Sequence, residues 1–155
     1  FSGKNAKDLI GIISLMYDLN NIYNAFRFKA FSQADESEIS EHILPVKSRI
    51  PSHKWKEMLN TEGADEYVSV LSETGFGRQM REANPDMSKS TIQYDILRLK
   101  SKYAKLYLRR TTNAAVSLYT ILFLLSAEVK NITTIIEGVR YNVSPQEIER
   151  LLIIV

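Results

Sequence analysis

The sequence of 155 residues contains no cysteine and has only two histidines, four prolines and six glycines. The absence of cysteine excludes a disulfide framework and agrees with a protein of a reducing cellular compartment. His42 and His53 lack the spacing of a metal site, and no two acidic residues pair with a third ligand. Because glycine is scarce and no Asn-Gly or Asp-Gly turn is present, the sequence gives little support for β-hairpins. It predicts an all-α protein without a metal site.

A strong charge of either sign is also missing, since the formal net charge is only +2. A dedicated nucleic-acid-binding protein usually carries a clustered basic face. One predicted helix does combine aromatic and basic side chains, which could stack on bases and bind phosphate. Its basic residues do not share one helical stripe, so nucleic-acid binding is the less favoured interpretation. These residues are Arg98, Lys100, Lys102, Tyr103, Lys105, Tyr107, Arg109 and Arg110.

No uninterrupted apolar run is long enough to cross a membrane. The longest, Ala114–Ala127, falls short of the roughly 18–20 residues that a span requires. We therefore expect it to be a buried core helix, with membrane contact as the less favoured alternative.

Apolar residues recur at helical spacing along most of the chain. The pattern predicts a long helix from about residue 6 to 31, short helices after residues 35 and 51, another ending near Gly75, and a short turn over residues 76–83. Asn84-Pro85-Asp86 is the clearest loop, and helical periodicity resumes from Ser88. We expect a first helical unit at 1–85 and a second at 86–155.

Two segments, 17–43 and 127–152, repeat one pattern. When Asn21-Ile22 is aligned with Asn131-Ile132, Asp18 falls on Glu128. Removing one residue from the first turn also aligns Glu38-Ile39 with Glu147-Ile148. Such a repeat indicates one helix–turn–helix unit used at least twice.

The turns of the two segments have matching helix-capping residues. Ser144 and Glu147 are spaced as a capping box, with Pro145 at the first helical position. Asp35 and Glu38 repeat the box in the first segment. Asn142 stands where a helix end requires a left-handed residue.

Residues suited to catalysis or nucleotide binding are few. No nucleophile lies near His42 in the sequence, so a surface histidine is the better interpretation. Gly75-Phe76-Gly77 has neither a third glycine nor a preceding strand, which argues against a nucleotide loop.

The C-terminal segment resembles the signature of the C/d-subunit family of rotary ATPases, which occurs in archaeal and bacterial V/A-type ATPases and in the eukaryotic V-ATPase. The residues that carry it begin at Glu128-Val129-Lys130-Asn131-Ile132 and continue through Ser144-Pro145-Gln146-Glu147-Ile148. The earlier Asp18-Leu19-Asn20-Asn21-Ile22 looks like an upstream copy. The signature residues are Asn21, Arg27, Lys29, Glu128, Asn131, Ser144 and Glu147. Departures are Glu137 in place of arginine, Asn142 in place of glycine, and Leu125-Ser126 in place of Lys-Glu.

The resemblance implies an all-helical, funnel-type subunit without a catalytic site or a cofactor. Such a subunit sits on the cytoplasmic side of the membrane and links the central stalk to the proteolipid ring, for proton or sodium transport. The family has about three helical units, so we expect a further part to precede Phe1. An unrelated helical adaptor, a helical nucleic-acid-binding domain, and an enzyme whose site lies in that further part remain alternatives.

Overall fold

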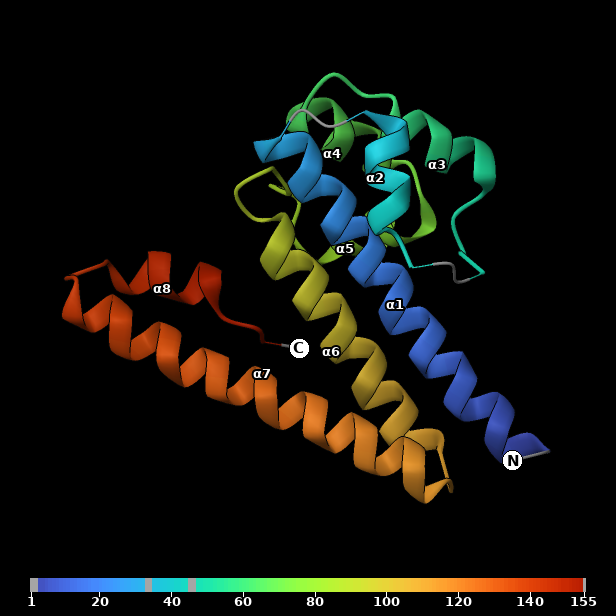
Figure 1. The fold of residues 1–155 in the computed structure, drawn as a ribbon. Coiled ribbons are helices and arrows are strands. Elements are labelled where there is room, and N and C mark those ends of the chain that lie inside the picture. The colour runs from blue at the N-terminus through green and yellow to red at the C-terminus, as the bar shows by residue number, and fades with distance from the viewer. Residues whose placement is uncertain (1–2, 33–34, 45–46, 155) are drawn as a thin grey trace. The chain divides into compact units, whose positions relative to one another are not determined.

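The computed structural model describes residues 3–32, 35–44 and 47–154, and these residues form eight helices and no strand (Figure 1). The predicted all-α fold is therefore confirmed. In chain order, the helices are α1 (Lys4–Phe31), α2 (Glu36–His42), α3 (Ser52–Leu59), α4 (Ala64–Ser72), α5 (Gly75–Ala83), α6 (Ile92–Arg110), α7 (Ala114–Arg140) and α8 (Pro145–Leu151).

The chain divides into two compact units. Ile13–Ile96 form one, and Leu97–Val155 with Phe1–Ile12 form the other. The Asn84-Pro85-Asp86 loop lies where it was predicted, between α5 and α6. We keep residues 1–85 and 86–155 as the proposed first and second helical units of the sequence, because such a unit and a compact unit of the structure need not share their ends.

The core of the Ile13–Ile96 unit forms where α1 meets the short helices. Leu15, Leu19 and Ile22 of α1 are fully buried, as are Tyr67 and Leu71 of α4. Each burial of a large apolar side chain contributes about 1.5–3 kcal/mol. This unit thus has an apolar core large enough to hold α1 in place.

Gly77 allows the close packing of α4 against α5. A Cβ atom at this position would lie 1.9 Å from the carbonyl oxygen of Leu71. The hydroxyl of Thr74 caps α5 by accepting the Gly77 amide at 3.0 Å. Gly75-Phe76-Gly77 forms the first turn of α5. The sequence analysis had argued against a nucleotide-binding loop at this segment. The short turn expected over residues 76–83 is a complete helix.

In the compact unit that contains Leu97–Val155, which we call the second unit, α8 lies beside the C-terminal half of α7 (Figure 1). The turn between them begins at Asn142, whose φ of 55° is left-handed. The amide of Asn142 donates to Val139 and that of Val143 to Gly138, as in a Schellman motif. Ser144 and Glu147 form the predicted capping box of α8, and Asp35 and Glu38 form that of α2. The predicted capping boxes of both turns are confirmed.

The expectation that Ala114–Ala127 is a buried core helix is wrong. The helix exists but continues to Arg140, and many of its large apolar side chains are exposed, including Leu118, Leu122 and Leu125. The apolar run shows that the helix is hydrophobic, but it does not show how many faces of the helix are covered by other elements. By length and composition, α7 is the one helix among the described residues that could cross a membrane.

Candidate functional site

Two asparagine side chains each hold a distant piece of backbone at both of its hydrogen-bonding groups. In the first repeat, the Asn21 amide donates to the Leu44 carbonyl at 2.9 Å and accepts the Leu44 amide at 3.0 Å. In the second, Asn131 donates to the Ile153 carbonyl at 3.1 Å and accepts the Ile153 amide at 2.7 Å.

The two pairs span 23 and 22 positions, and so differ by the single residue that the alignment removes. Asn21 is buried and Asn131 is half-buried. The prediction that both asparagines are at least partly buried and satisfy specific partners is confirmed. We call these two pairs the asparagine clamps. Each fixes the chain that follows the second helix to the middle of the first.

Asp18, one turn before Asn21, is fully buried and holds the next stretch of backbone. Its carboxylate accepts the Ser48 hydroxyl at 2.6 Å and the Arg49 amide at 2.7 Å. The Trp55 indole N–H donates to the Ser48 oxygen at 2.6 Å, so the hydroxyl connects the indole to the carboxylate. A buried carboxylate is stable when hydrogen bonds compensate for its lost hydration. Asp18 therefore has a structural role here.

Glu128, the equivalent acid in the second repeat, is exposed and lines a cavity of about 370 Å³. Asn131, Ile153 and Ser101 also line this cavity. The Ser101 side chain is buried, and its hydroxyl has no hydrogen-bond partner among the described residues. The two repeats thus share the asparagine clamp but differ at the acid.

The other signature residues have separate places. Arg27 is exposed, with its guanidinium 5.9 Å from the centre of the Tyr23 ring, and Lys29 is buried in the last turn of α1. Ser144 and Glu147 cap α8. The structure brings the signature residues together only in pairs along the two repeats, and it does not gather them into one site.

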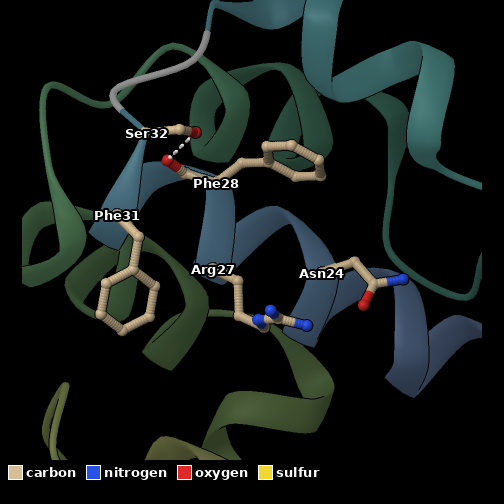
Figure 2. A pocket seen from close by; sticks show the side chains of 5 residues that line it. All are labelled: Asn24, Arg27, Phe28, Phe31 and Ser32. Atoms are coloured by element: carbon tan, nitrogen blue, oxygen red, sulfur yellow. Dashed lines mark hydrogen bonds between the residues drawn. The ribbon is translucent and has the colours of Figure 1, made fainter.

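A shallow pocket of about 260 Å³ lies at the C-terminal end of α1 (Figure 2). Arg27 and Asn24 supply its polar side chains, and Phe28 and Phe31 its apolar ones. The Ser32 hydroxyl donates to the Phe28 carbonyl at 2.8 Å, which engages it within its own helix (Figure 2). The pocket offers one cation and aromatic surface, without an acid–base pair.

The basic helix is not a continuous cationic surface. Lys100 is 7% exposed, and burial, with a smaller effect of Lys130, lowers its pKa to about 8. The Arg98 guanidinium donates to the Leu152 carbonyl at 3.0 Å and to the Arg150 carbonyl, so it binds the C-terminal end of α8. Two of the basic residues considered for phosphate binding thus belong to the packing of the second unit.

The two histidines show no catalytic or metal-binding arrangement in the part of the chain that the structure describes. A ring nitrogen of His42 lies 2.9 Å from the Glu38 carbonyl of its own helix, and the ring packs on Phe28 at 4.9 Å. No group of three metal-ligating side chains occurs among the described residues.

Sequence reasoning aligned Asp18 with Glu128 but missed the structural role of Asp18 and its partners Ser48 and Arg49. An acid on the apolar face of a long helix, three residues before a repeated asparagine, was the available signal. The partners carried no signal, because they lie 30 and 31 positions away or bond through the backbone.

A family model described as "ATP synthase (C/AC39) subunit" matches residues 1–151. Searches of curated proteins and of solved structures returned no match.

Proposed function

Because the chain belongs to the ATP synthase (C/AC39) subunit family, we propose that it is a non-catalytic coupling subunit of a V/A-type ATPase. In this role it links the central stalk to the membrane proteolipid ring during proton or sodium transport. It would lie on the cytoplasmic side of the membrane and attach through the ring. Family membership agrees with the resemblance found in the sequence and makes the chain a subunit of an ATP synthase complex.

The observation that carries the proposal is the asparagine clamp, present in both repeats. A coupling subunit must transmit torque without hinging inside its own helical units. Each clamp joins the middle of a long helix to the chain beyond the next helix through two hydrogen bonds. Because both backbone groups are satisfied, opening a clamp leaves two polar groups without partners. This arrangement supports a mechanical role.

The surfaces also suit binding. Partner proteins recognise broad surfaces with apolar centres and polar rims, and such surfaces require no catalytic residue. Exposed apolar side chains are numerous on α7, including Val129, Ile132 and Ile136.

The direct test is affinity capture of the tagged chain from detergent-solubilised membranes, with mass spectrometry of the captured proteins. We expect stalk and ring subunits together, and no ATP hydrolysis by the purified chain alone. Recovery of neither would favour the unrelated helical adaptor. Recovery of only one would contradict a linking role.

A second experiment separates coupling from assembly. Asn131→Leu opens one clamp, and Thr133→Ala serves as an exposed control on the same helix. In membrane vesicles we expect Asn131→Leu to lower ion pumping per ATP hydrolysed, while the complex still assembles. An unchanged ratio in a fully assembled complex would contradict a mechanical role for the clamp.

A further inference from the structure

The cavity of about 370 Å³ in the second unit lies between α6 and α7, at the asparagine clamp of the second repeat. Ser101 and Lys105, one turn apart, line it from α6, and Glu128 and Asn131 line it from α7. Apolar side chains complete its wall: Leu124, Ala127, Ile153 and Ile154. Ligand pockets usually have volumes of about 300–1,000 Å³, so this cavity is large enough to hold a ligand.

Ser101 has a hydroxyl that the fold buries without a partner. The residue is 2% exposed, and its hydroxyl oxygen makes no hydrogen bond among the described residues. Buried hydroxyls are normally paired, because burial without a hydrogen bond costs free energy. An unpaired hydroxyl in the wall of a polar cavity indicates that a ligand supplies its partner.

The first repeat shows what an acid at the position of Glu128 binds. Asp18 and Glu128 are equivalent within the repeated segments, and each lies three residues before a clamp asparagine. Asp18 accepts the Ser48 hydroxyl at 2.6 Å and the Arg49 backbone amide at 2.7 Å. The two donors are the side chain of one residue and the backbone of the next. An acid at this position is therefore suited to bind polypeptide at a residue that carries a hydroxyl.

Glu128 has the same acceptor atoms without such donors. It is exposed, and its carboxylate makes no hydrogen bond or ion pair among the described residues. The neighbouring Asn131 is already engaged, because its side-chain amide holds both backbone groups of Ile153. The carboxylate and the Ser101 hydroxyl are thus the two groups of the cavity that a ligand could satisfy.

Other classes of ligand fit this cavity less well. Glu128 is the only carboxylate among its lining residues, and no group of three metal-ligating side chains occurs in the described part of the chain. A calcium or magnesium site would need more oxygen ligands. A phosphate or another anion would meet the like charge of Glu128.

We propose that the cavity binds an extended polypeptide segment through a serine or threonine residue and the backbone amide that follows it. Glu128 accepts both donors, as Asp18 does in the first repeat, and the Ser101 hydroxyl donates to a carbonyl of the same segment. The inference rests on the repeat and on the cavity, and is independent of the proposed function.

A peptide that copies the segment held by Asp18 tests this chemistry. The probe is the acetylated and amidated tetrapeptide Lys47-Ser48-Arg49-Ile50. One control peptide has alanine in place of serine, and the other has an N-methyl group on the arginine amide. Each control lacks one donor at unchanged charge.

NMR titration of the ¹⁵N-labelled chain measures binding of the three peptides. We expect the probe to give saturable shifts at Ser101 and Glu128. Each control should bind about fivefold more weakly, because it loses one hydrogen bond. The absence of saturable shifts at the cavity, or equal binding of the three peptides, would overturn the proposal.

A pair of variants on α7 tests the carboxylate. Glu128→Gln should weaken the probe about tenfold, because hydrogen bonds to a charged acceptor are the stronger ones. Glu137→Gln makes the same change at another exposed position of the helix and should leave binding unchanged. Because both residues are exposed, the thermal midpoints should agree with that of the parent. Equal binding by Glu128→Gln and Glu137→Gln would contradict the proposal.

Ser101→Ala separates a role in binding from a role in folding. The change removes a buried hydroxyl that has no partner in the fold, so the thermal midpoint should stay the same or rise. Binding of the probe should still weaken about fivefold, through loss of one hydrogen bond. A lower thermal midpoint with unchanged binding would show that Ser101 serves the fold alone, against the proposal.

Photo-cross-linking in cells identifies the source of the segment. A photoreactive residue replaces Leu124 in the apolar wall of the cavity. We expect an adduct with a polypeptide, and mass spectrometry distinguishes a segment of the same chain from one of another protein. Glu128→Gln should abolish this adduct and Glu137→Gln should retain it. An adduct that is insensitive to Glu128→Gln, or the absence of a polypeptide adduct, would overturn the inference.

Discussion

At the residue scale, the asparagine clamp is the smallest unit that both repeats share. Replacing Asn131 with leucine removes the partners of the Ile153 amide and carbonyl. We expect a loss of about 1–3 kcal/mol in the free energy of unfolding, the usual result of leaving buried polar groups unpaired. Urea denaturation measures it, with Thr133→Ala as the control. Equal midpoints for the parent, the control and Asn131→Leu would show that the clamp adds no stability.

Gly77 and Gly75 form a matched pair of glycines in one helix. A Cβ at Gly77 would lie 1.9 Å from the Leu71 carbonyl oxygen, whereas one at Gly75 would meet nothing within 4 Å. We expect Gly77→Ala to destabilise the chain by about 1–3 kcal/mol through overpacking of α4 on α5. Gly75→Ala should be neutral or stabilise by up to about 1 kcal/mol, since alanine favours a helix. Thermal denaturation compares them, and similar midpoints would contradict the close approach.

At the scale of elements, Lys100 gives α6 a pH-dependent stability. Its pKa is lowered to about 8 by burial, and by Lys130, from an ordinary value of 10.5. Between about pH 8 and 10 the unfolded chain therefore holds more protons at this residue than the folded chain. The contribution of Lys100 to the free energy of unfolding therefore rises with pH between about pH 8 and 10. Below about pH 8 this contribution is at its least favourable.

Lys100→Met tests this contribution, and Lys102→Met on the exposed side of α6 is its control. We expect Lys100→Met to raise the free energy of unfolding at pH 7 by on the order of 2 kcal/mol, because no charge must be buried. The gain should shrink towards pH 10, while Lys102→Met tracks the parent. Urea denaturation at pH 7 and 9.5 measures it. A gain that does not change with pH would contradict the assignment.

At the scale of the whole molecule, the proposed peripheral attachment predicts how the chain leaves a membrane. Alkaline carbonate releases proteins held by protein contacts and leaves spanning proteins in the lipid. Although α7 is long and apolar enough to span, its clamp to Ile153 and the charged α8 oppose insertion. We expect the chain in the soluble fraction and the proteolipid in the pellet. Retention of the chain with the lipid would show that α7 is inserted.

Particular residues show how far the sequence could be interpreted. Asp35, Ser144 and Asn142 behaved as predicted, because capping and left-handed turns depend on a few neighbouring residues. The two asparagines were found because they repeat. Their partners Leu44 and Ile153, and the Ser48 hydroxyl on Asp18, were not found, because contacts across 22 to 30 positions leave no local pattern.

The sequence by itself determined the helices, their caps, the repeat and the family, because helical periodicity, cap chemistry and recurring residues are all written along the chain. Only the tertiary structure decided which copy of each feature is covered. It buries Asp18 and leaves Glu128 on a cavity, and it buries Ile22 and exposes Ile132. The two copies have similar residues, so hydropathy cannot distinguish them. What differs is the set of neighbouring elements, and burial depends on those neighbours.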